Sequence, residues 1–118
     1  MATKVKVPNI DELMKLKGVA AAGEFSDDGR CLSYKANVPM NDEQAQMTAQ
    51  FIATVSMMFK TLAGSYTQLS GMPWTPAHGW AYSGGDWSIC VGGNMGLFVE
   101  TAKADFNELF AALAGTRP

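Results

Sequence analysis

The first hydrophobic residues of the chain are spaced as on one face of a short helix. Three apolar residues share this face: Ile10, Leu13 and Met14. Asn9 occupies the N-cap position, Glu12 follows three residues later, and Gly18 is a helix stop signal. The pattern predicts a helix over about residues 10–17, preceded by a lead-in at residues 1–8 that we expect to be disordered.

Two strands joined by a tight turn are predicted next. Residues 19–25 contain a run of alanine and glycine, and in residues 30–35 Leu32 and Tyr34 alternate with other side chains. Between them, Asp28-Gly29 supplies the positive φ that a hairpin turn requires. Because small side chains let helices come close to a sheet, we expect the first strand to be central.

A long helix is predicted from about residue 42 to the mid-60s, with Asn41 or Asp42 as its N-cap. Its apolar positions are Met47, Phe51, Ile52, Val55, Met58, Phe59 and Leu62. At about 100° per residue they cover an arc of roughly 160°, whereas a helix on one sheet needs only about 100°. The helix is therefore either sunk deep in the core or covered on one flank by a second subunit. A small domain cannot easily enclose a helix, so we favour the second subunit.

The segment from Ser65 to Ala77, with Trp74 between two prolines, is predicted to be irregular. Alternating patterns then predict three strands around residues 80–82, 87–91 and 97–99. Two glycine-rich turns separate these strands, so neighbouring strands are expected to pair antiparallel.

A final amphipathic helix is predicted after Thr101 or Asp105, either of which could be its N-cap, and Gly115 ends it. Its apolar face carries Phe106, Leu109, Phe110 and Leu113. The order is thus helix, two strands, helix, three strands, helix. The long helix is the crossover between the two parts of the sheet. We expect one α+β domain over residues 9–115.

Several motifs resemble a known family. They are Leu13–Gly18 with Val19, the Asp28-Gly29 hairpin, the Met-rich long helix, Gly71-Met72-Pro73-Trp74-Thr75-Pro76, Gly79-Trp80, Ser83-Gly84-Gly85-Asp86, and Phe98-Val99-Glu100-Thr101 with Lys103–Phe110. Over about residues 10–114 the chain resembles the roadblock/dynein-light-chain family, and in particular short bacterial members with no assigned activity.

The resemblance implies a roadblock/profilin-like fold. This is a five-stranded antiparallel sheet in the order 2-1-5-4-3, with the long crossover helix on one face and two short helices on the other. It also implies a homodimer formed through the long helix and the edge strand near Trp80. Family members act as platforms for small GTPases and as regulators of motility or motor complexes.

Composition narrows the classes of function. Of 118 residues, 47% are hydrophobic and 17% charged, and the formal net charge is −2. A chain without a basic face has no electrostatic basis for binding nucleic acid. The polar start is unlike a signal peptide, and no apolar run is long enough to predict a membrane span. We therefore expect a cytoplasmic protein.

The two cysteines, Cys31 and Cys90, fit a reducing compartment. In the strand order implied by the resemblance they lie on strands three spacings apart, roughly 14 Å. A disulfide needs Cα atoms within about 7 Å, so we predict free thiols.

No catalytic, cofactor or metal site is predicted. Residues 92–96 (Gly-Gly-Asn-Met-Gly) could cradle a phosphate only before a helix, but a strand pattern follows them, so they are interpreted as a hairpin. His78 is the only histidine, and one histidine with two distant cysteines does not form a zinc site. Ser83 and Asp86 are interpreted as turn residues.

The residues proposed to contact a partner or a second copy are Phe51, Ile52, Val55, Met58, Phe59, Leu62, Trp74, Trp80 and Tyr82. For Trp74 and Trp80, partner contact and local core packing both remain open, because tryptophan is typical of interface anchors. Met57 and Met58 are interpreted as packing residues, with an adaptable docking face as the alternative.

The sequence therefore predicts a non-catalytic, homodimeric scaffold that holds a protein partner, with regulation of a small GTPase as one role. The alternative is a profilin-like domain that senses a small ligand in a pocket lined by Trp80, Trp87 and Tyr82. An enzyme is disfavoured, because no acid, base and nucleophile are grouped together.

Overall fold

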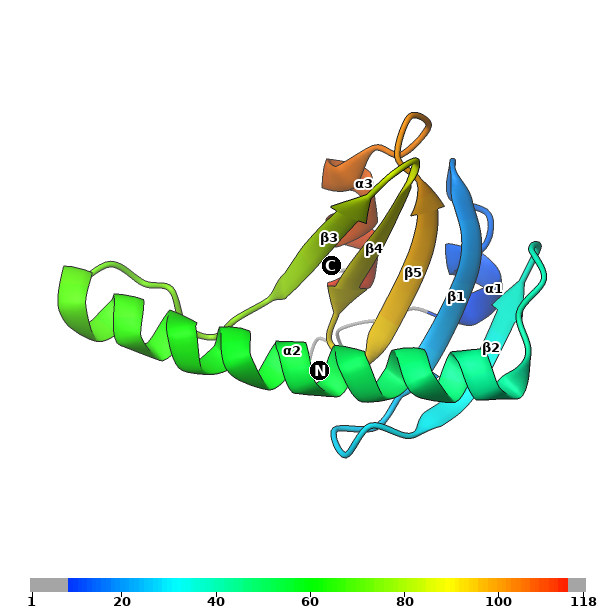
Figure 1. Ribbon diagram of the computed structural model, residues 1–118. Helices are drawn as coiled ribbons and strands as arrows, with labels where there is room; N and C mark the ends of the chain where they lie inside the picture. The colour runs from blue at the N-terminus through cyan, green and yellow to red at the C-terminus, as the bar shows by residue number, and fades with distance from the viewer. Residues whose placement is uncertain (1–8, 115–118) are drawn as a thin grey trace, which may run out of the picture.

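A computed structural model of the protein describes residues 9–114 (Figure 1). The expectations for the lead-in at residues 1–8 and for the helix stop at Gly115 lie outside these residues. The elements are α1 (Ile10–Leu13), β1 (Val19–Phe25), β2 (Cys31–Ala36), α2 (Asp42–Ser70), β3 (Gly79–Gly84), β4 (Trp87–Gly92), β5 (Met95–Glu100) and α3 (Phe106–Leu113). Their order confirms the predicted one, although α1 is a single turn rather than a helix to residue 17.

The five strands form one antiparallel sheet in the order β2-β1-β5-β4-β3, as the resemblance implied. β1 is therefore an inner strand between β2 and β5, in agreement with its small side chains. Both hairpins on the β3 side have two-residue loops, which begin at Gly85 (φ 60°) and Gly93 (φ 56°). Positive φ at the first loop residue is the requirement of a type II′ turn.

Helices cover both faces of the sheet, with α2 on one face and α1 and α3 on the other (Figure 1). The larger core cluster lies between the sheet and the two short helices, around Leu13, Leu97, Val99 and Leu109. The smaller cluster lies under α2 and joins Phe25, Ala49, Ile52 and Val91.

The helix α2 starts at a complete capping box. Asn41 accepts a hydrogen bond from the backbone N–H of Gln44, whose side chain accepts one from the N–H of Asn41. The helix ends at Gly71, which adopts the left-handed conformation (φ 72°). Residues 65–70, predicted to be irregular, are helical, and this prediction was wrong. Their two serines, and Gly64 just before them, are weak helix formers, but Leu62, Tyr66 and Leu69 keep the helical spacing.

Only the first half of α2 rests on the sheet, against β1 and β2. The second half projects past the edge strand β3, and residues 71–78 return along it (Figure 1). Along the line where α2 touches the sheet, the residues are mainly small. Ala45 and Ala49 are buried in the helix, and Gly96 of the sheet leaves room for Ile52, whose Cδ1 would lie 3.0 Å from a Cβ at position 96.

Candidate interaction surface

An open apolar groove lies between one flank of α2 and the outer strands of the sheet. Its volume is about 540 Å³. Its walls are formed by the loop before α2, the helix and strands β3 to β5: Val38, Pro39, Met40, Gln44, Met47, Thr48, Phe51, Ile52, Val55, Phe59, Trp80, Ala81, Tyr82, Ile89 and Phe98. The groove exists because α2 lies mainly over the β1 and β2 half of this face. It reaches β3 and β4 through fewer contacts, which include Ile52 on Val91 and Ser56 and Phe59 on Trp80.

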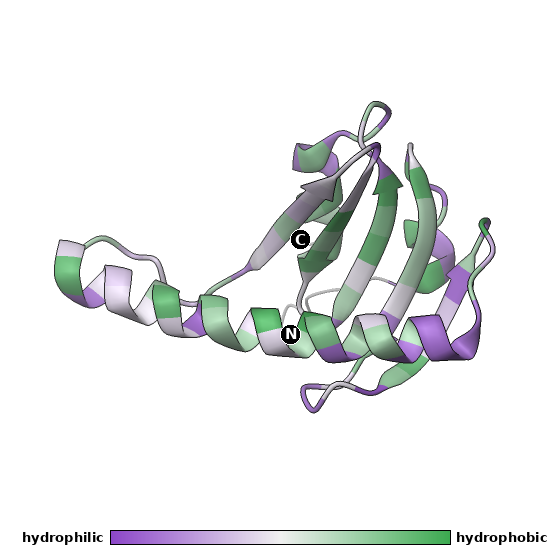
Figure 2. Cartoon of the chain, in the orientation of Figure 1, coloured by the Kyte–Doolittle hydropathy of each residue, from purple (hydrophilic) through white to green (hydrophobic). Residues whose placement is uncertain are grey.

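The surface around the groove is unusually poor in charge. Lys60 is the only Asp, Glu, Lys or Arg between Gln44 and Gly85. Most of the large hydrophobic side chains that the described residues expose lie in the same stretch: Met47, Phe51, Met57, Met58, Phe59, Leu62, Tyr66, Leu69, Met72, Trp74 and Tyr82. Hydropathy along the ribbon shows the strongest polarity at the first turns of α2, around Asp42 and Glu43 (Figure 2).

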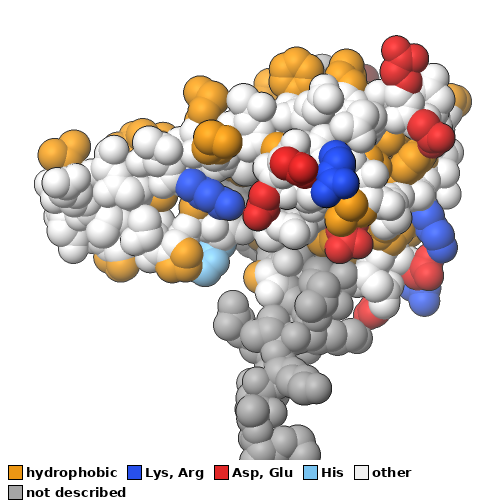
Figure 3. All heavy atoms as spheres, turned by 90° about the horizontal axis from the view of Figure 1, so that it is seen from below, with side chains coloured by type: hydrophobic (Ala, Val, Ile, Leu, Met, Phe, Trp, Pro, Cys, Tyr) orange, Lys and Arg blue, Asp and Glu red, His pale blue; other side chains and the backbone are white. Residues whose placement is uncertain are grey.

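The space-filling view from below shows the same asymmetry (Figure 3). Hydrophobic side chains follow the long helix onto its projecting half, whereas the visible acidic side chains lie over the other half of the molecule. An apolar surface with so few charges is typical of a surface that is covered by another macromolecule.

The residues proposed from the sequence as interface candidates fall into three groups. Exposed ones are Phe51, Met58, Phe59, Leu62, Trp74 and Tyr82. Val55 and Trp80 are half-buried and line the groove. Ile52 is only 5% exposed, because its side chain packs on Phe25 and Val91 in the core.

The two tryptophans considered for partner contact are held by their own chain. The indole N–H of Trp80 donates a hydrogen bond to Ser56 Oγ at 2.9 Å, and its ring lies 5.7 Å from that of Phe59. Trp74 packs against Tyr66 at a centroid distance of 5.0 Å, yet it stays 48% exposed. Local packing and an exposed face therefore coexist at Trp74.

Several surface residues were missed by sequence reasoning. Tyr66, Leu69 and Met72 extend the apolar surface to the tip of the projecting half of α2. They were missed because the helix was expected to end in the mid-60s. The signal that could have found them is the spacing of Leu62, Tyr66 and Leu69, which continues the helical period up to Gly71.

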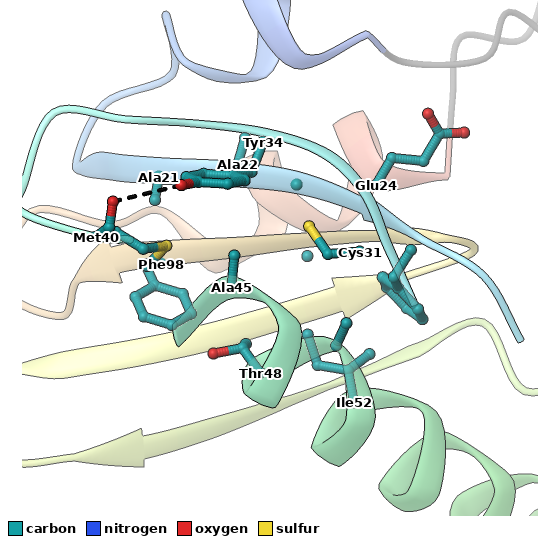
Figure 4. A pocket seen from close by; sticks show the side chains of 14 residues that line it. Ala21, Ala22, Glu24, Cys31, Tyr34, Met40, Ala45, Thr48, Ile52 and Phe98 are labelled. Atoms are coloured by element: carbon teal, nitrogen blue, oxygen red, sulfur yellow. Dashed lines mark hydrogen bonds between the residues drawn. The ribbon is translucent and has the colours of Figure 1, made fainter. Parts of the chain in front are cut away.

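A small hollow lies under α2, between Ala21, Tyr34, Ala49 and Phe98 (Figure 4). Its volume is only about 40 Å³ and its walls are almost entirely apolar. Ligand sites usually enclose about 300–1,000 Å³. A ligand of ordinary size would therefore have to bind in one of the larger open hollows. Two of them hold the predicted aromatic residues: the groove, where Trp80 and Tyr82 lie, and a hollow of about 270 Å³ beside it, lined by Trp87.

The turn residues that were considered as candidates for chemistry have structural roles in the sheet. The Gly92–Gly96 segment forms the β4–β5 hairpin, as predicted. The hydroxyl of Ser88 lies 2.7 Å from that of Ser83 and 2.7 Å from that of Thr101, which links β3, β4 and the end of β5. In this chain of hydroxyls no base is placed to activate a nucleophile. Among the described residues no three potential metal ligands cluster, and no helix is long and apolar enough to span a membrane.

Both cysteines are free thiols, as predicted. Cys90 is fully buried, and burial raises its pKa to about 11. Burial also raises the pKa of the partly buried Cys31. Raised pKa values favour the protonated thiol, which is the unreactive form.

Several solved structures share this fold. The roadblock/LC7 domain from Streptomyces avermitilis matches with a TM-score of 0.68 and 11% identity, over 89% of this chain and 85% of that one. The gliding protein MglB from Thermus thermophilus matches with a TM-score of 0.66 and 14% identity, over 97% of this chain and 96% of that one. An MglB in a tetrameric arrangement matches with a TM-score of 0.66 and 15% identity, over 97% of this chain and 95% of that one. The chain therefore has the roadblock fold.

Residues 9–115 match a family described as "Uncharacterized conserved protein (DUF2173)", and the chain belongs to that family. No curated protein matches the sequence.

Proposed function

We propose that the protein is a non-catalytic, homodimeric interaction module, in which α2 and β3 form the contact between copies. The observation that carries the proposal is the apolar surface that runs from the groove to the tip of α2, in a stretch where Lys60 is the one Asp, Glu, Lys or Arg. Fully burying a Phe, Leu or Met side chain contributes roughly 1.5–3 kcal/mol. A surface with this many exposed side chains of that kind can offset the cost of association, about 4–15 kcal/mol.

A second copy suits this surface better than an unrelated partner of opposite charge, since there is almost no charge to complement. The projecting half of α2 also supports a dimer. It extends beyond β3, so it can lie over the uncovered groove of a neighbouring copy. The tetrameric MglB arrangement is an example of self-association on the same fold.

The composite surface of two copies then holds a protein partner. The resemblance to the roadblock/dynein-light-chain family suggests a small GTPase for this role. This part of the proposal is tested separately, by measuring binding of purified small GTPases from the same genome, loaded with GDP or a GTP analogue, to the immobilised protein. Binding of none of them would remove the GTPase from the proposal and leave the homodimer standing.

Sedimentation velocity over a range of concentrations tests the homodimer. Phe51 is 65% exposed and lines the groove, whereas Leu32, 54% exposed, lies on β2 at the other edge of the sheet. We expect Phe51→Glu to weaken the dimer at least about 100-fold, because a buried carboxylate is costly. Leu32→Glu, which introduces the same charge outside the proposed contact, serves as the control and should leave the dimer intact. A monomeric wild-type chain, or equal dimerisation of both variants, would refute the proposal.

The small-ligand alternative finds less support. The hollow under α2 is too small for a ligand of ordinary size, and the groove is open to solvent. We therefore expect a thermal-shift screen of metabolites to give no increase in melting temperature.

A further inference from the structure

Seven apolar residues of α2 form a seam that runs from the groove to the tip of the helix. Successive members are three or four positions apart, which places one of them on each turn. Val55 is half-buried, and the other six are exposed. The members of this α2 seam are Met47, Phe51, Val55, Met58, Leu62, Tyr66 and Leu69.

Two members of the α2 seam carry an oxidisable sulfur. The side chains of Met47 and Met58 are 50% and 64% exposed, whereas Met95, in the core, is 5% exposed. Oxidation of a methionine thioether to the sulfoxide turns an apolar, flexible side chain into a polar one. Met47 and Met58 are separated by about three helical turns, so they lie on nearly the same side of α2.

The two cysteines compete poorly for an oxidant at neutral pH. Peroxide reacts with the thiolate form of cysteine, and both thiols are held in the protonated form. Burial raises the pKa of Cys90 to about 11, and burial also raises the pKa of Cys31. A thioether has no proton to lose, so its reaction with peroxide needs no ionisation. Among the sulfur atoms of residues 9–114, peroxide therefore reaches those of the exposed methionines most readily.

We infer that Met47 and Met58 are a peroxide-sensitive switch, in which their oxidation to sulfoxides separates the two copies of the proposed homodimer. The inference rests on that homodimer and adds its regulation. At each residue a lone pair of the sulfur attacks one oxygen of hydrogen peroxide. The S–O bond forms as the O–O bond breaks, and the remaining hydroxyl takes up the second proton and leaves as water. The sulfur is oxidised by two electrons, and methionine sulfoxide reductases reverse the change.

The α2 seam offers a sulfoxide oxygen few hydrogen-bond donors. Thr48, Thr54 and Thr61 are next to members of the seam, and each donates its hydroxyl proton to the carbonyl four residues earlier. A polar oxygen that is buried between two copies without a donor is costly. Two sulfoxides in the contact should therefore weaken the dimer at least about tenfold.

Sedimentation velocity before and after treatment with hydrogen peroxide tests the switch, and peptide mass spectrometry identifies the oxidised methionines. We expect the dissociation constant of the dimer to rise at least about tenfold once Met47 and Met58 are oxidised. A methionine sulfoxide reductase should then restore the original constant. Because the contact covers the seam, peroxide reacts with copies that are free in the equilibrium. Oxidation of Met58 should therefore become slower as the protein concentration rises.

Substitution by leucine separates the seam methionines from the others. Leucine is close to methionine in size and hydrophobicity but contains no sulfur. The double variant Met47→Leu/Met58→Leu should dimerise like the wild-type chain and keep its dimer in peroxide. The matched control is Met57→Leu, since Met57 is 65% exposed but lies about 100° around the helix from Met58, off the seam. This control should remain as sensitive to peroxide as the wild-type chain.

The outcomes separate the switch from the homodimer. If the dimer keeps its affinity although both methionines are oxidised, the switch is wrong and the proposed function stands. The switch is also wrong if the double variant is as sensitive as the wild-type chain, or if Met47 and Met58 are oxidised no faster than Met95. If the double variant does not dimerise, reversal by the reductase decides, because it needs no substitution. A monomeric wild-type chain refutes both proposals.

Discussion

Trp80 and Ser56 are joined by a hydrogen bond of 2.9 Å from the indole N–H to the hydroxyl oxygen. The bond connects the edge strand β3 to the middle of α2, at the point where the helix leaves the sheet. Phe59, one turn further along α2, contacts the same indole ring. These contacts set the position of the projecting half of α2 and hold one wall of the groove.

Replacing Ser56 with alanine should therefore destabilise the fold. A partly buried hydrogen bond contributes about 1 kcal/mol, and its loss leaves the indole N–H without this acceptor. Alanine also favours the helix, so the matched control is Ser65→Ala, an exposed serine of the same helix. In urea denaturation we expect Ser56→Ala to be about 1 kcal/mol less stable than Ser65→Ala. Equal stabilities would show that the bond contributes nothing.

The two cysteines should differ in reactivity toward an alkylating reagent. At pH 8 the native chain should be labelled at partly buried Cys31 and not at Cys90, whose pKa is raised to about 11 by burial. In denaturant both should be labelled. Mass spectrometry after brief alkylation measures this, and native labelling of Cys90 as fast as of Cys31 would contradict the described packing.

The thiol of Cys90 also makes the stability of the fold depend on pH in the alkaline range. Above its ordinary pKa, near 9, Cys90 ionises in the unfolded chain but keeps its proton in the folded one. The folded chain then binds more protons than the unfolded chain, so stability falls as pH rises from about 9 to about 11. The difference in slope between the wild-type chain and Cys90→Ala isolates this effect from Tyr34, whose pKa is also raised, mainly by its hydrogen bond to Asp42.

Local signals in the sequence were sufficient to predict most elements. Asn9, Asn41 and Asp105 each accept a hydrogen bond from the backbone N–H three residues later. Asn9 was the predicted cap, and Asn41 and Asp105 are each one of the two alternatives that the pattern offered. The strand order was a different matter. Short loops establish that consecutive strands are antiparallel, but the place of β1 beside β5 depends on long-range pairing, and it was anticipated only through the family resemblance.

The surface was predictable in kind but not residue by residue. The arc of roughly 160° indicated that α2 has more apolar width than one sheet can cover. Phe51 and Ile52 show what the arc could not resolve, since they are neighbours and one is exposed while the other is in the core. The helix contacts the sheet along a narrow line through Ala45, Ala49 and Ile52, and the position of this line depends on the tertiary fold.

Two glycines of the α2–β3 region should respond in opposite ways to the same substitution. A Cβ at Gly79 would lie 2.4 Å from the carbonyl oxygen of Val91 and 3.2 Å from Phe110. Since the first of these atoms belongs to the backbone of β4, it cannot move aside without distorting the sheet. We expect Gly79→Ala to cost roughly 1–3 kcal/mol, as overpacking of an interior usually does.

Gly64, in the interior of α2, has no neighbouring atom within 4 Å of an added Cβ. Alanine there reduces the backbone entropy lost on folding, so Gly64→Ala should stabilise the chain by up to about 1 kcal/mol. Urea denaturation of both variants, at the same protein concentration, measures the contrast. A destabilising Gly64→Ala would mean that this part of the helix is covered in solution, whereas a neutral Gly79→Ala would contradict the close approach of β3 to β4 and α3.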